Sequence, residues 1–110
     1  MKTDRLAKIG FTCVAVTGDR QITGGFCGDL LSWVMGRAKN GDCWFTVMAN
    51  LNTIAVATLA EVSAIVFCHG ATLPEEAVER AREEGIDVFC TELSVYDAAV
   101  KFHEFFTGAQ

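Results

Sequence analysis

The segment 43–68, CWFTVMANLNTIAVATLAEVSAIVFC, decides the fold. It opens with a run rich in aromatic and β-branched residues over 43–48, which is typical of a buried strand. Asn50 or Asn52 then caps a helix that is apolar almost all round, so we expect this helix to be buried on several sides. A second apolar run over 64–68 predicts another buried strand. Strand, helix and strand in this order predict two parallel strands joined by a right-handed crossover.

The same alternation continues on both sides of this segment, and glycine, asparagine or proline marks the end of most elements. The predicted helices cover 3–9, 30–38, 50–61, 73–84 and 95–106, and the predicted strands or extended segments cover 13–16, 21–27, 43–48, 64–68 and 86–90. The predicted caps are Asp29, a Thr72–Glu75 capping box and a Ser94–Asp97 capping box. Residues 1–110 are therefore predicted to form a single α/β domain with a mostly parallel sheet and helices packed on it.

The composition supports a well-packed core and excludes two classes of partner. Hydrophobic residues form 51% of the chain and ten glycines add to the apolar share, whereas typical domains reach about 45–50% with glycine included. A sheet covered on both faces accounts for the excess, and a homodimer interface accounts for it further, so we expect a homodimer. The net charge of −5, without a basic run, excludes nucleic acid as a partner. No apolar stretch approaches the roughly 20 residues of a membrane span.

The cysteines indicate free thiols in a reducing compartment. Their number is odd and no two of them have C-x-x-C spacing, so we predict neither disulfides, nor a metal, nor a cofactor. The N-terminus lacks the apolar run of a signal peptide, and we therefore expect a cytoplasmic protein. The five residues are Cys13, Cys27, Cys43, Cys68 and Cys90.

Polar residues follow the predicted strands, and ligands of open parallel sheets bind beyond the carboxyl ends of the strands. The densest group lies in the glycine-rich segment 18–29, where Arg20 suits a phosphate or carboxylate and Thr23 adds a hydroxyl. The predicted ligand is therefore a small anion, such as a nucleotide or a phosphorylated metabolite. The predicted ligand-binding residues are Asp19, Arg20, Thr23, Gly24, Gly25, Asn50 and His69.

Each of these residues also has a structural alternative. Asp19 and Arg20 can pair with each other and tie the turn, Asn50 can serve only as a helix cap, and His69 can be an ordinary turn residue. Cys68 and His69 are neighbours on a strand, so their side chains should diverge and cannot form a nucleophile with its base. No catalytic residue is predicted, and neither common nucleotide-binding glycine motif occurs.

Two glycine-containing stretches resemble the DRTGG domain family: DRQITGG over 19–25 and GDLLS over 28–32. The similarity continues through most of the chain, although two residues separate Arg20 from Thr23 here. The resemblance implies a fold similar to the N-terminal domain of HPr kinase/phosphorylase. It also implies a regulatory module, because such domains accompany CBS domains in certain pyrophosphatases. The protein partner that it implies is an anti-sigma-type kinase or a metabolic enzyme.

The first functional hypothesis is a non-enzymatic regulatory or sensor module that binds a small anion at the carboxyl ends of the strands. Two alternatives stay open. One is a protein-interaction module without a ligand. The other is a small enzyme that acts on a phosphorylated substrate through Asp19, Arg20 and His69.

Overall fold

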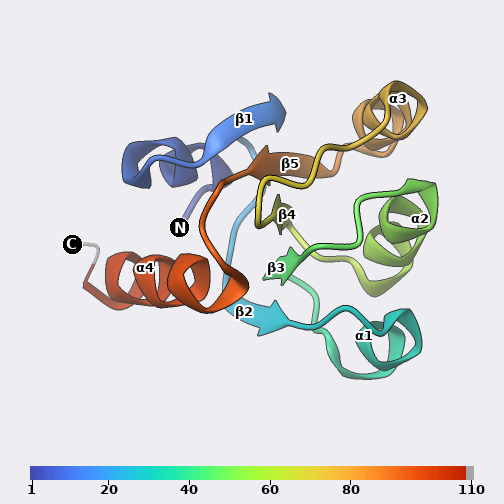
Figure 1. Ribbon diagram of the computed structural model, residues 1–110. Helices are drawn as coiled ribbons and strands as arrows, with labels where there is room; N and C mark the ends of the chain where they lie inside the picture. Colours follow the sequence, from blue (N-terminus) through green and yellow to red (C-terminus); the bar gives the residue numbers. More distant parts are fainter. Residues whose placement is uncertain (109–110) are drawn as a thin grey trace.

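The computed structural model describes residues 1–108, which form a five-stranded sheet with helices on both faces (Figure 1). The elements in chain order are η1 (Thr3–Ile9), β1 (Thr12–Ala15), β2 (Gly24–Cys27), α1 (Leu31–Arg37), β3 (Asp42–Thr46), α2 (Leu51–Ala60), β4 (Ala64–Phe67), α3 (Glu75–Glu84), β5 (Asp87–Cys90) and α4 (Val95–Gly108). The predicted class, a mostly parallel α/β sheet with packed helices, is confirmed.

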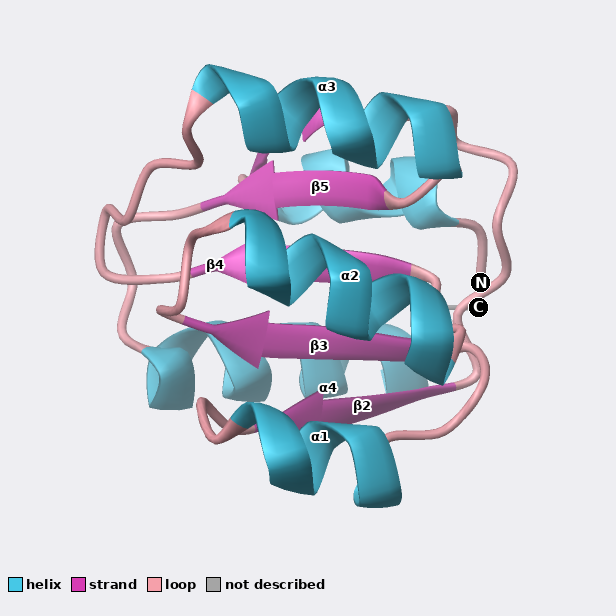
Figure 2. Cartoon of the chain, turned by 90° about the vertical axis from the view of Figure 1, so that its right-hand side faces the viewer, coloured by secondary structure: helices cyan, strands magenta, loops and turns pink. Residues whose placement is uncertain are grey.

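The strand order is β1-β5-β4-β3-β2, and β2 to β5 run parallel to one another. Each of these strands pairs with the next one along the chain, so the crossovers step across the sheet in one direction. Right-handed crossovers then place α1, α2 and α3 on the same face, while α4 and η1 cover the other face (Figures 1 and 2). The first strand, β1, lies outside this pattern because it pairs with β5 in the antiparallel direction.

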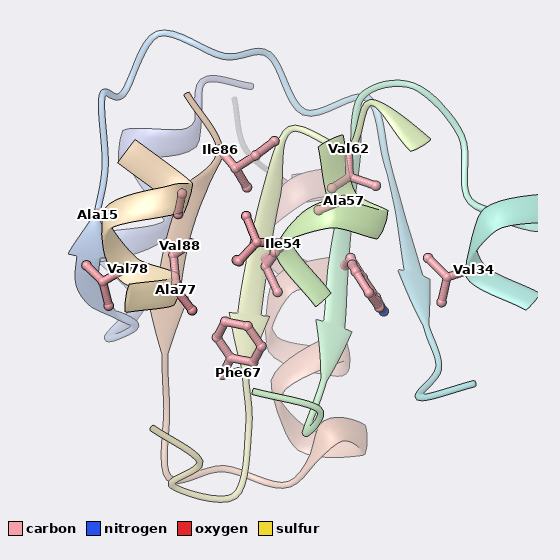
Figure 3. Close-up of a cluster of buried hydrophobic side chains, with 13 residues drawn as sticks. Ala15, Val34, Ile54, Ala57, Val62, Phe67, Ala77, Val78, Ile86 and Val88 are labelled. Carbon is pink, nitrogen blue, oxygen red and sulfur yellow. The ribbon is translucent and has the colours of Figure 1, made fainter. Parts of the chain in front are cut away.

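The sheet separates two hydrophobic clusters. One cluster packs Trp44, Ile65 and Phe67 of the sheet against α1, α2 and α3 (Figure 3), and the other packs Phe45 and Phe89 against α4 and η1. Both β3 and β4 are buried on both sides, which explains why their sequences are continuous apolar runs rather than alternating ones.

Helix α2 is less buried than its sequence predicts. It buries Thr53, Ile54 and Ala57 against the sheet, but Leu59 is 69% exposed on its outer side. The expectation of burial on several sides is wrong, because α2 is one of three helices in a single layer and nothing in residues 1–108 covers that layer. An apolar residue on the outer face of a helix therefore does not imply a further layer.

Two of the predicted caps are present. The Asn50 side chain accepts a hydrogen bond from the backbone N–H of Thr53 at 3.1 Å, and the Ser94 hydroxyl accepts one from the N–H of Asp97 at 3.0 Å. The Thr72 cap is wrong, since α3 begins after Pro74 with no side-chain cap. Proline needs no partner for a backbone N–H and has a φ suited to the start of a helix.

Asp29 does not cap α1, which has Leu30 at its N-cap position. The Asp29 carboxylate instead accepts hydrogen bonds from the Thr46 hydroxyl at 2.7 Å and from the Val47 backbone N–H at 2.9 Å. These bonds join the loop after β2 to the end of β3. Asp29 therefore connects two neighbouring loops rather than starting a helix.

Candidate functional site

The parallel strands of the sheet begin on one side of the molecule and end on the other, and the predicted site residues are divided between these two sides. We call the side where β2 to β5 begin the amino edge, and the side where they end the carboxyl edge. Because β1 is antiparallel to β5, the end of β1 lies at the amino edge. Asp19 and Arg20 follow β1, whereas His69 follows β4. The prediction that these residues meet at the carboxyl edge is wrong.

The loop after β1 is held down by a buried carboxylate at the amino edge. Asp87, the first residue of β5, is fully buried. Its oxygens accept hydrogen bonds from the Thr17 N–H at 2.8 Å, the Thr17 hydroxyl at 3.0 Å and the Gly18 N–H at 3.2 Å, and another from the Thr3 hydroxyl. One side chain thus anchors both η1 and the start of the glycine-rich segment.

Arg20 is half-buried and uses two of its donors inside the protein. Its Nε donates to the Gly85 carbonyl at 2.6 Å and its Nη1 to the Val62 carbonyl at 3.3 Å. These carbonyls belong to the loops that precede β5 and β4. The structure therefore favours the structural alternative for Arg20, in which it ties the turn, although its partners are backbone carbonyls and not Asp19.

The carboxyl edge contains Asn50 and His69, and both have structural surroundings. The amide oxygen of Asn50 is occupied by the α2 cap. His69 is exposed in a left-handed turn with φ of 58°, and its backbone N–H donates to the Leu93 carbonyl at 2.8 Å. The loops of this edge, 28–30, 47–50, 68–74 and 91–94, contain no lysine or arginine but include two carboxylates. This composition is unfavourable for an anion.

The remaining predicted residues, Thr23, Gly24 and Gly25, line a polar pocket of about 390 Å³ on the amino-edge side of β2. We call it the polar pocket. Parallel pairing of Gly24 with Asp42 brings the loop after α1 beside the start of β2. The side chains that this loop and the end of α1 add are Arg37, Lys39, Asn40 and Asp42.

Two cations and one carboxylate set the charge of the polar pocket. Arg37 stacks its guanidinium over the Trp33 ring at 4.3 Å from the ring centroid, which orders an otherwise exposed cation. Lys39 is exposed, and its backbone N–H donates to the buried Asp42 carboxylate at 2.8 Å. This carboxylate forms the floor, so close to Gly24 that a Cβ there would lie 2.8 Å from Asp42 Oδ1.

A second hollow lies on the opposite face of β2, between this strand and α4. We call it the apolar groove; its volume is about 380 Å³. Phe45, Ala99, Phe102 and Phe106 supply most of its walls, and Cys27 and His103 also line it. Gly24, Gly25 and Phe26 contribute to both hollows, so β2 is the wall that separates them.

Three of the thiols have little nucleophilic character. Burial raises the pKa of Cys43 well above its ordinary range and raises the pKa of Cys68 to about 12. Burial, and then the Asp29 carboxylate, raises the pKa of Cys27. These thiols are therefore protonated at neutral pH. Cys68 is buried while His69 is exposed, which agrees with the expected divergence of the two side chains.

Within residues 1–108, no group of three histidine, cysteine, aspartate or glutamate side chains is arranged to hold a metal ion. The same residues include no helix long and apolar enough to cross a membrane.

The arrangement of strands and helices defines a DRTGG-like α/β fold. The fold is similar to the CBS and DRTGG domains of the regulatory region of Clostridium perfringens pyrophosphatase, which were solved in complex with the activator diadenosine tetraphosphate. The TM-score is 0.73 at 15% identity, over 90% of this chain and 44% of that chain. The chain thus spans less than half of that regulatory region, and at this identity the likeness concerns the fold alone.

No family model matches the sequence, and no curated protein matches it. The fold similarity agrees with the resemblance read from the sequence, but it does not establish membership of the DRTGG family.

Sequence reasoning missed half of the polar pocket. The sequence pattern places Arg37 in the predicted helix 30–38 and Lys39 and Asn40 just after it, and no local pattern connects these residues with Thr23. The one residue that could have indicated this contact is Gly41, which has a left-handed backbone with φ of 91°. A Cβ at Gly41 would lie 2.3 Å from Thr23 Oγ1, so the two loops must touch at a glycine.

Proposed function

We propose that this protein is a non-catalytic regulatory module that binds a small anion in the polar pocket. The observation that carries the proposal is the placement of Arg37 and Lys39 beside Thr23 and the glycines of β2. An arginine fork and a lysine ammonium are the side chains that proteins use for phosphate groups. We therefore place the site beside β2 and not at the carboxyl edge, whose loops contain no lysine or arginine.

The candidate ligand class is a nucleotide or another phosphorylated metabolite. The volume of about 390 Å³ falls in the range of small-molecule sites. The regulatory region with a similar fold was solved with diadenosine tetraphosphate, which makes adenine nucleotides the first compounds to test. The enzymatic alternative is not supported, because the residues that it needs do not meet: Arg20 lies at the amino edge and His69 at the carboxyl edge.

Titration calorimetry with ATP, diadenosine tetraphosphate and inorganic phosphate tests this proposal. We expect at least one of them to bind, and the double variant Arg37→Ala/Lys39→Ala to weaken binding about ten- to a hundredfold. The matched control is Arg80→Ala/Arg82→Ala, which removes two exposed cations from α3 and should leave the affinity unchanged. Absence of binding at millimolar concentrations, or equal effects of both double variants, would refute the site.

The homodimer also belongs to this proposal. Leu30 and Met48 are exposed apolar side chains on the two loops that Asp29 connects, and Leu51 is exposed at the start of α2. Exposed apolar side chains of this kind favour an interface. Sedimentation equilibrium should give twice the chain mass at micromolar concentration. Protein partners such as an anti-sigma-type kinase or a metabolic enzyme, and a cytoplasmic location, are part of the same proposal and derive from the sequence.

A further inference from the structure

The strand β2 is an edge strand of the sheet, and within residues 1–108 no other strand pairs with its outer side (Figure 1). The Gly28 N–H donates to the Phe45 carbonyl of β3 at 3.2 Å. Backbone groups alternate in direction along a strand, so the N–H and C=O groups of Gly25 and Cys27 face away from β3. Both residues are exposed. This row of free groups can receive another strand.

The other outer strand of the sheet, β1, is different. The pairing of β1 with β5 shifts its register between Cys13 and Ala15, and such irregularities discourage further strand pairing. The pairing of β2 with β3 is regular over its whole length. Neither a proline nor a charged residue interrupts β2, whose sequence is Gly-Gly-Phe-Cys. Of the two edges, β2 is the one suited to a partner.

The two hollows beside β2 define what that partner must contain. Side chains of an added strand would point alternately to the two faces of the sheet. On one face they meet the apolar groove, whose floor stays open because Gly25 has no side chain; a Cβ there would already lie 3.3 Å from Phe102. On the other face they meet the polar pocket with Arg37 and Lys39.

We propose that the β2 edge binds an extended segment of a partner protein as a sixth strand, and that this segment alternates apolar with acidic residues. Its main chain pairs with Gly25 and Cys27, its apolar side chains enter the groove against α4, and its carboxylates meet Arg37 and Lys39. This is strand addition, in which backbone bonds give affinity and alternate pockets give specificity. Charge complementarity with the two cations selects the acidic residues.

This inference rests on the proposed function in one respect: the carboxylates of the added strand and the small anion use the same two cations. Occupancy of the polar pocket by the anion would therefore oppose strand addition. By linkage, the strand must weaken anion binding by the same factor that the anion weakens strand binding. The module would then convert the concentration of an anion into the release of a partner.

A labelled seven-residue peptide of alternating valine and glutamate, capped at both ends, is the probe, with a valine–lysine peptide and a scrambled valine–glutamate peptide as controls. By fluorescence anisotropy we expect the alternating acidic peptide to bind at least tenfold more tightly than either control. The variant Arg37→Glu/Lys39→Glu should reverse the preference in favour of the valine–lysine peptide. Arg80→Glu/Arg82→Glu, with the same change in net charge on α3, should preserve it.

Hydrogen exchange at single amides locates the peptide. Exchange at Gly25 and Cys27 should slow at least tenfold on binding, whereas exchange at Thr12 on the opposite edge should not change. Filling the groove with Ala99→Met should weaken binding at least fivefold, and Ala55→Met on the outer face of α2 should not. Binding without protection of Gly25 and Cys27, or without a preference reversed by the charge swap, would overturn the proposal.

The outcomes of the two proposals are separable. Peptide binding with the expected specificity, together with no binding of ATP, diadenosine tetraphosphate or phosphate, would support the strand site and refute the anion site. Anion binding without peptide binding would overturn strand addition and leave the proposed function standing. Protection of Gly25 and Cys27 in a concentration-dependent dimer without peptide would mean that a second copy occupies the edge, and would overturn the assignment to a partner segment.

Discussion

The two halves of the segment 17–25 have opposite surroundings, although only nine residues contain both. Thr17, Gly18 and Arg20 bond to Asp87 and to the carbonyls of Gly85 and Val62. The second half, Thr23–Gly25, lines a pocket beside the edge strand β2. A motif arginine is therefore a weak guide to a ligand until its own hydrogen bonds are known, because a guanidinium that donates to backbone carbonyls has a structural role that the motif does not reveal.

The largest effect should come from removing the anchor of the first half. Asp87→Ala deletes the acceptor for two backbone N–H groups and two hydroxyls inside the protein. We expect a loss of about 3 kcal/mol in the free energy of unfolding, because the buried Thr3 hydroxyl would remain unsatisfied and the loop after β1 would lose its anchor. Urea denaturation measures this loss. Asp19→Ala, at an exposed neighbouring carboxylate, should change stability by less than about 0.5 kcal/mol.

Replacing each of the two arginines, Arg20 and Arg37, with alanine tests the comparison directly. Arg20→Ala should cost about 2 kcal/mol of stability, because the carbonyls of Gly85 and Val62 lose their donors, and it should leave anion affinity unchanged. Arg37→Ala should show the reverse, with weakened anion binding and nearly unchanged stability. Calorimetric titration and thermal melting of both variants are sufficient. If Arg20→Ala weakened binding without lowering the melting temperature, the assignment of the two halves would have to be exchanged.

The smallest of these effects concerns the second half. Gly24→Ala places a methyl group 2.8 Å from Asp42 Oδ1, and we expect a loss of about 1 kcal/mol from the displaced carboxylate, together with a narrower polar pocket. Gly36→Ala is the control, since a Cβ on this α1 residue meets nothing within 4 Å. It should stabilise the protein by about 0.5–1 kcal/mol through helix propensity. A neutral Gly24→Ala would indicate that the pocket floor adapts freely.

Most elements of the fold were predictable from the sequence because each depends on local periodicity. The apolar runs of β3 and β4, the Asn50 and Ser94 caps and the glycine ends of η1 and α3 were all read correctly. The direction of β1 was not, because its partner β5 lies more than seventy residues away and the loop between β1 and β2 is compatible with either direction. Short-range patterns contain no information about that pairing.

The candidate site was half predictable for the same reason. Thr23, Gly24 and Gly25 stand out as a glycine cluster, and they line the polar pocket. Arg37 and Lys39 reach it only through the parallel pairing of β2 with β3, which brings the far end of α1 back to the start of β2. The apolar groove depends on α4, whose Phe102 and Phe106 were expected on one helix face but could not be assigned to a particular strand.

The antiparallel β1 has a consequence for how the chain acquires its structure during synthesis. The strands β2 to β5 pair in the order in which they are made, so each can dock when it emerges. The first twenty residues cannot, because Thr17 bonds to Asp87 across 70 residues and β1 pairs only with β5. At about 5–20 residues per second, that separation is a wait of about 4–14 s. During this time β1 has no strand to pair with, and contacts so distant in sequence form late and slowly. The N-terminal segment is therefore where the nascent chain is most exposed to chaperones and to misassociation, even though it is firmly anchored once folding is complete.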